Sequence, residues 1–299
     1  MPKICYRQKK FSADRVDKIN KANVIIAEYA AQGFELTLRQ LYYQFVSRDF
    51  IANNQREYKN LGDIINDARL AGLVDWEAIV DRTRNLQKLA HWEAPSDIIS
   101  ACANQYRIDK WADQPYRVEC WIEKDALVGV IEGVCNELDI PFFSCRGYTS
   151  QSEMWSAAMR LKSHRKGKQT PLILHLGDHD PSGKDMTRDI TDRLSEFSGG
   201  IVEVRRLALN MPQVEHYNPP PNPAKITDSR AEKYIEEFGA ESWELDALEP
   251  AVIAQLIRDA VMEVRDQGQW DEAVTKEEEQ KAQLTKVSDK WATIIEELE

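Results

Sequence analysis

The apolar positions of the first 72 residues recur at helical spacing and predict three helices. Ser12 is placed to cap a helix that runs to Gly33. Thr37 and Gln40 have the spacing of a capping box, so a second helix is expected to begin immediately after Thr37. A third helix is expected over residues 56–70. Three short helices followed by an irregular segment indicate a helix-turn-helix or winged-helix unit.

The second predicted helix carries two adjacent tyrosines that should face different surroundings. Tyr42 falls on the apolar stripe of this helix and is expected in the core, whereas Tyr43 lies off the stripe and is expected to be accessible. Arg39 lies four positions before Tyr43 and shares its face. A guanidinium group there can polarise a phenol or bind a phosphate through two hydrogen bonds. The alternative interpretation is that Tyr43 is an ordinary surface aromatic residue.

From residue 118 onward, strand-like and helix-like segments alternate. Strands are expected at 118–123, 140–144, 171–176 and 201–207, with helices at about 126–138, 150–163 and 183–197. This alternation predicts βαβ units and a largely parallel sheet. Residues 85–117 are typical of a mixed helical connector with a break at Pro95. The proline-rich run 218–223 predicts an extended loop, and the segment from about 228 is helical in composition.

Charge is distributed unevenly along the chain and supports a division into three parts. The net charge is +3 over residues 1–117, −3 over 118–224 and −11 over 225–299. We therefore predict an α/β protein with an N-terminal winged-helix domain (1–117), a Rossmann-like domain with a mostly parallel sheet (118–224) and an acidic helical C-terminal extension (225–299). The basic N-terminus is compatible with DNA contact by the first domain, although a solvated helix end would have the same composition.

Composition places the chain among globular proteins of the cytoplasm. Its 299 residues suffice for about two domains, and 42% hydrophobic with 30% charged residues is ordinary for such proteins. No apolar stretch approaches a membrane span, and the N-terminus has no signal-peptide core. The five cysteines are scattered, which favours reduced thiols over a zinc site or a disulfide framework.

Three carboxylates follow two of the predicted strands. Glu123 closes the strand 118–123, and Asp178 and Asp180 follow the strand 171–176. Ligands bind at the carboxyl ends of strands in open α/β sheets, and Mg²⁺ prefers carboxylate oxygens. These acids are therefore candidate Mg²⁺ ligands, and Glu123 could alternatively transfer a proton to a leaving oxygen. The competing interpretation is a capped turn, in which Pro181 opens a helix and the aspartates have no further role.

Four other residues near these motifs are considered for binding. Lys124 could contact a phosphate, or it could simply pair with a nearby acid. Arg82 and Arg84 are candidates for DNA contact, although exposed loop arginines are common. His179, between the two aspartates, could support the candidate metal ligands, but an exposed loop histidine is the expectation.

Taken together, these motifs resemble those of a known family. Glu123 followed by Gly177-Asp178-His179-Asp180-Pro181-Ser182-Gly183 resembles a TOPRIM domain. The run Thr37-Leu38-Arg39-Gln40-Leu41-Tyr42-Tyr43 is similar to the tyrosine motif in the winged-helix domain of type IIB topoisomerase A subunits and the related meiotic double-strand-break protein. Ser144-Cys145-Arg146-Gly147-Tyr148 resembles the glycine-containing loop between that family's acidic motifs. The resemblance covers roughly residues 10 to 210.

The resemblance implies a set of roles for these residues. Tyr43 would be the nucleophile with Arg39 assisting, and Glu123, Asp178 and Asp180 would bind Mg²⁺. Arg146 would join Arg82, Arg84 and Lys124 in contacting double-stranded DNA. The chain would act as a homodimer, and the family's GHKL-type ATPase is a separate B subunit, of which this chain carries no recognisable counterpart. The chain resembles a compact, stand-alone relative.

The leading hypothesis is a Mg²⁺-dependent DNA transesterase that forms a 5′-phosphotyrosyl link and can reseal the strand. One alternative is a TOPRIM nuclease that uses water as the nucleophile. Another is a DNA-binding component with an inactive site. A haloacid-dehalogenase-like phosphatase is disfavoured because D-x-D does not follow the first strand, and a dinucleotide enzyme because no G-x-G-x-x-G does.

Overall fold

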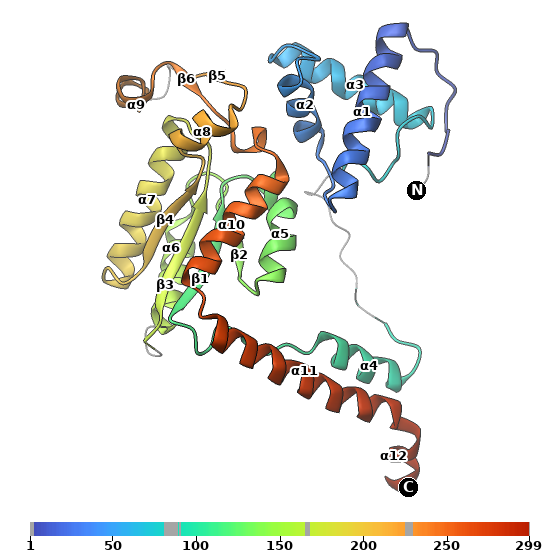
Figure 1. Cartoon of the computed structure of the whole chain (residues 1–299), viewed down its shortest axis with the longest axis vertical. Coiled ribbons are helices and arrows are strands. Elements are labelled where there is room, and N and C mark those ends of the chain that lie inside the picture. The colour runs from blue at the N-terminus through green and yellow to red at the C-terminus, as the bar shows by residue number, and fades with distance from the viewer. Residues whose placement is uncertain (1–2, 81–88, 90, 165–167, 225–229, 299) are drawn as a thin grey trace.

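A computed structural model describes residues 3–80, 89, 91–164, 168–224 and 230–298 of the chain. Its N-terminal part contains the three predicted helices, α1 (Ala13–Ala31), α2 (Leu38–Ser47) and α3 (Gln55–Leu70), shown in blue in Figure 1. The predicted caps are confirmed, because Ser12 accepts a hydrogen bond from the amide of Arg15, and Thr37 and Gln40 form the capping box. In the described residues before position 81, strand-type pairing is limited to isolated bridges, Cys5 with Ala71 and Leu36 with Ile79.

A parallel sheet forms the centre of the second part of the chain. Its strands are β1 (Tyr116–Ile122), β2 (Phe142–Ser144), β3 (Thr170–Leu176) and β4 (Glu203–Ala208), in the spatial order β2-β1-β3-β4. All three pairings are parallel, so the predicted α/β class and parallel sheet are confirmed. The four strands lie within three residues of the positions predicted from the apolar runs.

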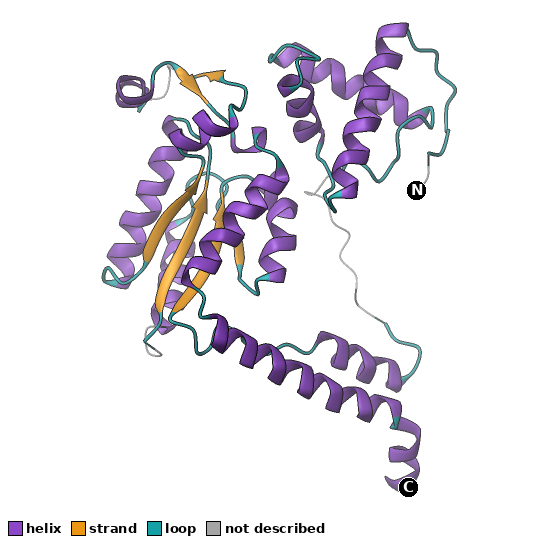
Figure 2. Ribbon diagram, viewed as in Figure 1, coloured by secondary structure: helices purple, strands orange, loops and turns teal. Residues whose placement is uncertain are grey.

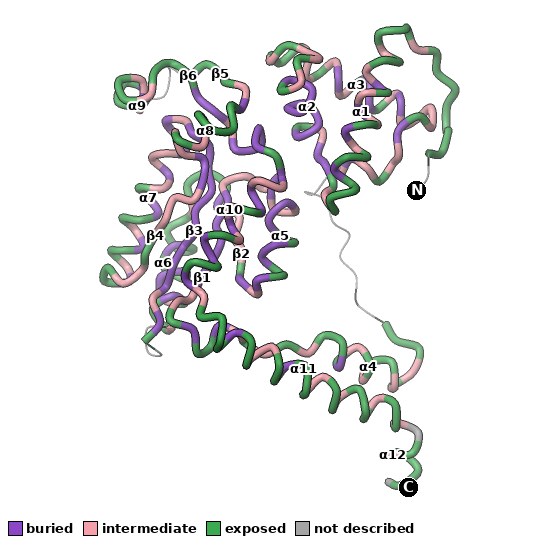
Figure 3. Tube along the Cα trace, in the orientation of Figure 1, coloured by how far each residue is buried: buried purple, intermediate pink, exposed green. Residues whose placement is uncertain are grey.

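Helices cover both faces of this sheet (Figure 2). Successive strand residues point to opposite faces, so Leu172 and Leu174 enter one apolar core and Ile173 enters the other. The first core is closed by α5 (Val128–Glu137), which follows a single turn at Asp125–Leu127, and by α10 (Pro250–Val264). The second is closed by α6 (Gln151–His164) and α7 (Pro181–Ser198). Figure 3 shows the largely buried strands β1 and β3 between these layers.

Several short elements lie beyond the carboxyl ends of the strands (Figure 1). They are α8 (Met211–Tyr217), β5 (Asn222–Pro223), α9 (Ala231–Phe238), β6 (Glu241–Ser242) and a turn at Leu245–Ala247. The strands β5 and β6 pair antiparallel, and part of the expected proline-rich loop is therefore strand. The backbone of Trp243 exchanges two hydrogen bonds with His179, of 2.8 and 2.9 Å, which ties this layer to the end of β3.

A helical arm extends away from the sheet (Figure 1). It consists of α4 (Pro95–Gln105), which lies alongside α11 (Gln267–Asp289), and of the terminal α12 (Trp291–Leu298). The break predicted at Pro95 is the first residue of α4. The C-terminal quarter is helical as expected, but α10 belongs to the sheet core and only α11 and α12 extend into the arm. None of the helices in the described ranges is long and apolar enough to span a bilayer.

Candidate functional site

Two of the predicted acids meet at the carboxyl edge of the sheet. Because β1 and β3 are parallel neighbours, the residues that follow them emerge side by side. The amide of Glu123 donates to the carbonyl of Leu176 at 2.9 Å, which extends the ladder by one residue. The amide of Asp178 in turn donates to Oε2 of Glu123 at 3.1 Å. The structure thus brings Glu123 and Asp178 together as the strand pattern predicts.

Asp180 is held by the start of α7. Its carboxylate accepts a hydrogen bond from the amide of Gly183 at 2.6 Å and caps the helix, with Pro181 in the first turn. The helix cap that the capped-turn interpretation predicts is therefore present at Asp180. Its charge also raises the pKa of Glu123, so this acid contributes to the same electrostatic environment.

His179 was expected to be exposed, and that expectation is wrong. Its side chain is fully buried, with Nδ1 2.8 Å from the hydroxyl of Tyr234 and with Phe238 and Trp243 packed against the ring. The hydroxyl of Tyr234 also donates to the carbonyl of His179 at 2.8 Å. These partners come from α9 and the segment after β6, which a local sequence pattern does not reveal. Burial lowers the pKa of His179 to about 4, and the ring is neutral near pH 7.

Arg206 on β4 fixes the backbone of the acidic loop, a role that the sequence analysis missed. Its guanidinium donates to the carbonyls of Asp178 at 2.6 Å, Gly177 at 3.1 Å and Gly183 at 2.8 Å. A further bond of 2.7 Å reaches the hydroxyl of Thr187. Burial lowers the pKa of Arg206 to about 10, so it remains charged at neutral pH. The sequence signal was an arginine on a strand beside the acidic motif, but strand arginines are common.

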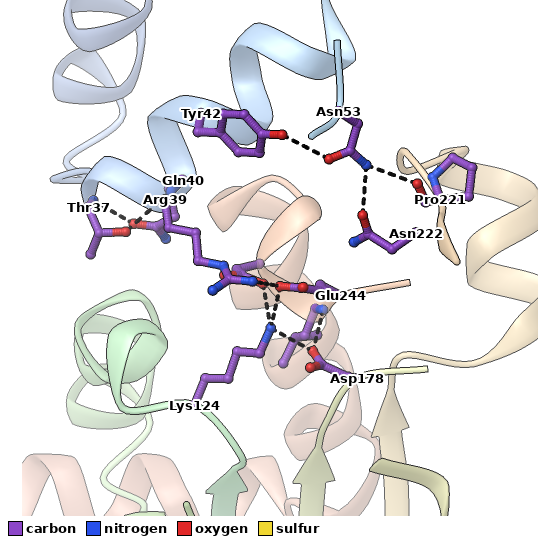
Figure 4. A network of polar contacts seen from close by, with 12 residues as sticks. Thr37, Arg39, Gln40, Tyr42, Asn53, Lys124, Asp178, Pro221, Asn222 and Glu244 are labelled. Carbon is purple, nitrogen blue, oxygen red and sulfur yellow. Dashed lines mark hydrogen bonds and ion pairs between the residues drawn. The ribbon is translucent and has the colours of Figure 1, made fainter. Parts of the chain in front are cut away.

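Lys124 lies at the centre of a cluster of carboxylates (Figure 4). Its ammonium nitrogen is 3.0 Å from Oδ1 of Asp178, 2.9 Å from Oε2 of Glu244 and 2.7 Å from Oδ1 of Asp246. Burial alone would lower the pKa of Lys124, but Asp246, Asp178 and Glu244 raise it above its usual value. Lys124 therefore pairs with acids in this structure, as one of its two interpretations expected, and stays fully charged.

Burial and neighbouring acids disfavour the ionised form of two carboxylates at this edge. Burial raises the pKa of Asp178 to about 7, against the opposing effect of Lys124, and Glu123 and Asp246 add to the increase. Burial and Asp180 likewise raise the pKa of Glu123. Such crowding is relieved by a proton or by a hard cation. Within the described ranges, however, no three His, Cys, Asp or Glu side chains are arranged as a ready metal site.

The donor chemistry of the edge nevertheless fits Mg²⁺. Glu123, Asp178 and Asp180 offer only oxygen ligands, which are those that Mg²⁺ prefers. Two of the three carboxylates have raised pKa values and would gain from a nearby cation. Asp178 already contacts Lys124 and accepts a 2.8 Å hydrogen bond from the amide of Leu245. Binding all three acids to one ion would require these contacts to rearrange.

The tyrosine helix α2 is joined to this edge by Arg39. Its Nε lies 3.0 Å from Oδ2 of Asp246, and Nη2 pairs with Glu244. Glu244 and Asp246 therefore connect Arg39 on α2 with Lys124 after β1. Figure 4 shows Glu244 between Arg39 and Lys124. A second connection is made by Asn53, whose side-chain amide donates to the carbonyl of Pro221 and to Oδ1 of Asn222, each at 2.9 Å.

Tyr43 was expected to be accessible, and the structure corrects that expectation. Only 3% of Tyr43 is exposed, little different from Tyr42 at 4%, whose burial was predicted. The turn at Leu245–Ala247 packs on α2, and Ala247 joins the same apolar cluster as both tyrosines. The off-stripe face of α2 is thus covered by a segment about 200 residues later in the chain.

The environment of Tyr43 keeps its hydroxyl protonated. Burial raises its pKa, and the charges of Asp246 and Glu244 raise it further, against the smaller lowering effect of Arg39. The guanidinium carbon of Arg39 lies 5.9 Å from the centre of the Tyr43 ring. A cavity of about 170 Å³ adjoins the pair, lined by Arg39, Tyr42, Tyr43, Asn53, Asn54, Gln55, Tyr58, Asn222 and Glu244.

The remaining candidates for DNA contact lie away from this network or outside the described ranges. The side chain of Arg146 is 81% exposed and is 3.4 Å from Oδ2 of Asp125. Arg82 and Arg84 lie outside the described residues.

Comparison with known proteins adds no identity. No protein-family model matches the chain, and a search of curated proteins found no match.

Proposed function

We propose that this chain is a Mg²⁺-dependent DNA-cleaving transesterase, similar in organisation to the A subunit of type IIB topoisomerases. The observation that carries the proposal is the direct connection between the tyrosine helix and the acidic edge. Arg39, beside Tyr43, and Lys124, beside Glu123, share the carboxylates of Glu244 and Asp246. One chain therefore places a phenol, two cations and three candidate metal ligands in a single region. The winged-helix and TOPRIM assignments of the two parts belong to this proposal.

The proposed chemistry assigns one task to each group. The Tyr43 oxygen would attack a backbone phosphorus of double-stranded DNA, forming a phosphotyrosyl bond as the bond from phosphorus to the 3′ oxygen breaks. The phenol proton would pass to solvent water. The departing 3′ oxygen would take a proton from solvent water, or from Glu123 in the alternative in which Glu123 is not a Mg²⁺ ligand. Arg39 and Lys124 would hold phosphate oxygens. Glu123, Asp178 and Asp180 would hold Mg²⁺, which supplies charge compensation for the phosphate.

The assembly follows from the same resemblance. Cleavage of both strands needs two tyrosines, so we propose a homodimer in the cytoplasm, with Arg146 and the basic residues Arg82 and Arg84 among the DNA contacts. A GHKL-type ATPase would be a separate partner. Tyr43 is buried in the present arrangement, and reaction requires the turn at Leu245–Ala247 to move away from it.

A simple nuclease is a second candidate, and the state of Tyr43 favours it. A protonated phenol that is 3% exposed is a poor nucleophile, whereas the carboxyl edge beside it carries acids with raised pKa values. Water would then attack the phosphorus. Glu123 or Asp178 would accept its proton, and the 3′ oxygen would leave.

A single experiment separates the two candidates. The protein is incubated with end-labelled supercoiled DNA and Mg²⁺, denatured, and examined for label that migrates with protein. The variant is Tyr43→Phe, and Tyr42→Phe is the matched control. Tyr42 is the neighbouring residue of the same helix, and its hydroxyl likewise makes a hydrogen bond, to Asn53 at 2.9 Å. Label lost only in Tyr43→Phe supports the transesterase. Free cut DNA in all three proteins supports the nuclease, and uncut DNA in all three, also with an added ATPase partner, contradicts both.

A further inference from the structure

Two acids that neither the motifs nor the resemblance singled out hold both cations of the proposed site. Glu244 and Asp246 lie between β6 and α10, more than 110 residues after Lys124. Arg39 and Lys124 each pair with both of them. In this arrangement the two residues best suited to bind a DNA phosphate are already occupied by carboxylates of the same chain.

The two acids differ in how they are held. The side chain of Asp246 is 2% exposed, and its two oxygens are divided between Lys124 and Arg39. The side chain of Glu244 is 24% exposed and lines the cavity beside Tyr43. Asp246 is therefore an enclosed part of the structure. Glu244 reaches the same cations from the accessible side, where another anion could replace it.

The contacts of Glu244 match those that a phosphate oxygen makes in proteins. A single oxygen, Oε2, accepts from the guanidinium of Arg39 and lies 2.9 Å from the ammonium of Lys124. Arginine and lysine together on one anionic oxygen form a common phosphate-binding arrangement. A phosphodiester carries one negative charge, as the Glu244 carboxylate does. Exchange of one for the other would leave the charge of the site unchanged.

We propose that Glu244 occupies the position of a nucleic-acid backbone phosphate, and that a bound phosphate displaces it from Arg39 and Lys124. This inference rests on the proposed function and assigns Glu244 the role of a competing internal anion. Glu244 also borders the cavity beside Tyr43, so a phosphate that takes its place would lie next to the phenol.

The test measures DNA affinity without cleavage. Binding of a fluorescent duplex oligonucleotide is followed by anisotropy in EDTA, for the wild type, Glu244→Gln and Glu241→Gln. Glu241 is an exposed acid three residues earlier and provides the same change of charge. Removal of the competing anion should tighten binding by about tenfold in Glu244→Gln, whereas Glu241→Gln should change it less than about twofold. Adding Arg39→Gln to Glu244→Gln should abolish the gain.

The outcomes separate this inference from the proposed function. Equal affinities in Glu244→Gln and Glu241→Gln, with measurable binding by the wild type, overturn the inference and leave DNA binding intact. Tighter binding by Glu244→Gln without cleavage in Mg²⁺ supports the inference and contradicts the proposed activity. Absence of binding by every protein contradicts both. Thermal unfolding of each variant checks that none of them has lost its structure. Glu244→Ala, a second variant, should also bind the duplex more tightly than the wild type.

Discussion

The guanidinium of Arg206 donates a 2.6 Å hydrogen bond to the backbone carbonyl of Asp178. Through its other bonds, to Gly177 and Gly183, it holds both ends of the acidic loop. Arg206→Lys should destabilise the protein by about 1–3 kcal/mol, because one ammonium group cannot satisfy these buried carbonyls. Urea denaturation measures the change.

Arg205→Lys is the control, because its partners Glu203 and Glu263 lie at the surface. Loss of the Arg205 guanidinium should lower the free energy of unfolding by less than about 0.5 kcal/mol. Equal effects would contradict the role of Arg206.

The glycines of the acidic loop provide a second prediction. A Cβ atom at Gly183 would lie 2.3 Å from the carbonyl oxygen of Asp178, and one at Gly177 would lie 2.8 Å from Oε2 of Glu123. Gly183→Ala must therefore move the backbone at the start of α7. Gly177→Ala can be accommodated if the Glu123 side chain shifts. We expect Gly177→Ala to fold and to lose most of the proposed Mg²⁺-dependent cleavage, with Gly183→Ala also losing stability.

The control for both substitutions is Gly133→Ala. Gly133 lies within α5 with open space around its Cβ position, so alanine should be tolerated and can add up to about 1 kcal/mol through helix propensity. Thermal unfolding and cleavage assays on the three variants test the prediction. Full activity in Gly177→Ala would show that the position of Glu123 does not matter for the reaction.

The local part of this structure was predictable from the sequence. The caps at Ser12 and Thr37 depend on neighbours within three residues, and the buried strand β3 is largely an apolar run. The proximity of Glu123 and Asp178 could be predicted because neighbouring parallel strands end at a common edge of the sheet. Each of these predictions needed only short-range spacing and the topology of a βαβ unit.

The surroundings of the site required contacts over long sequence separations. Tyr43 is off the apolar stripe of α2, and its burial comes from Ala247 and its neighbours. His179 is enclosed by aromatic residues from positions 234–243. Glu244 has no motif of its own, and its charged environment arises only when Arg39 and Lys124 meet it. The spacing of apolar residues shows which face of a helix packs on the neighbouring helices. It does not reveal that a distant segment covers the opposite face.

The buried His175 should make stability depend on pH in a defined window. Its ring is fully buried, Nδ1 lies 2.8 Å from Oγ1 of Thr187, and burial with a contribution from Arg206 lowers its pKa to about 3. An unfolded chain has a histidine pKa near 6.5, so between these values only the unfolded state binds the proton. The contribution of His175 is complete above about pH 6.5 and is lost progressively as the pH falls toward 3, by up to about 1.4 kcal/mol per unit.

His175→Gln should remove this dependence. Unfolding free energies from urea titrations at pH 7, 6 and 5 should fall less steeply in His175→Gln than in the wild type. Asp178, whose pKa is raised, contributes a slope of the opposite sign to both proteins and cancels in the comparison. His91→Gln, at an exposed position, should leave the wild-type slope unchanged. Parallel slopes in His175→Gln and the wild type would contradict the prediction.

Glu277 on α11 connects this helix to the segment before β1, and its contribution to stability can be tested separately from the candidate site. Its buried carboxylate accepts from the amide of Ile108 at 3.0 Å and pairs with Lys110 at 2.8 Å and Lys281 at 2.9 Å. Burial raises its pKa, but these donors lower it to about 2. Its stabilising effect is therefore present above about pH 4.5 and is lost as the pH falls toward 2.

Glu277→Gln should weaken the attachment of α11 to the segment after α4, at Ile108 and Lys110, by about 1–3 kcal/mol. Hydrogen exchange of the Ile108 amide and of the adjoining α4 amides should become faster while exchange in β1 and β3 stays unchanged, which locates the effect in the arm. Glu278→Gln, an exposed neighbour with the same change of charge, should have no such effect. Unaltered α4 exchange in Glu277→Gln would show that this carboxylate does not hold the arm.

The position of Glu244 and Asp246 late in the chain has a consequence during synthesis. Arg39, Lys124 and Asp178 leave the ribosome well before the residues at 244–246 that contact them. Chains fold progressively from the N-terminus, so α2 can form early while its tyrosine face still lacks the covering turn. Residues 243–289 therefore close the site, add α10 to the sheet and give α4 its partner after the earlier segments have been made. A nascent or truncated chain that stops before residue 244 would present Tyr43, Arg39 and Lys124 without their internal carboxylate partners.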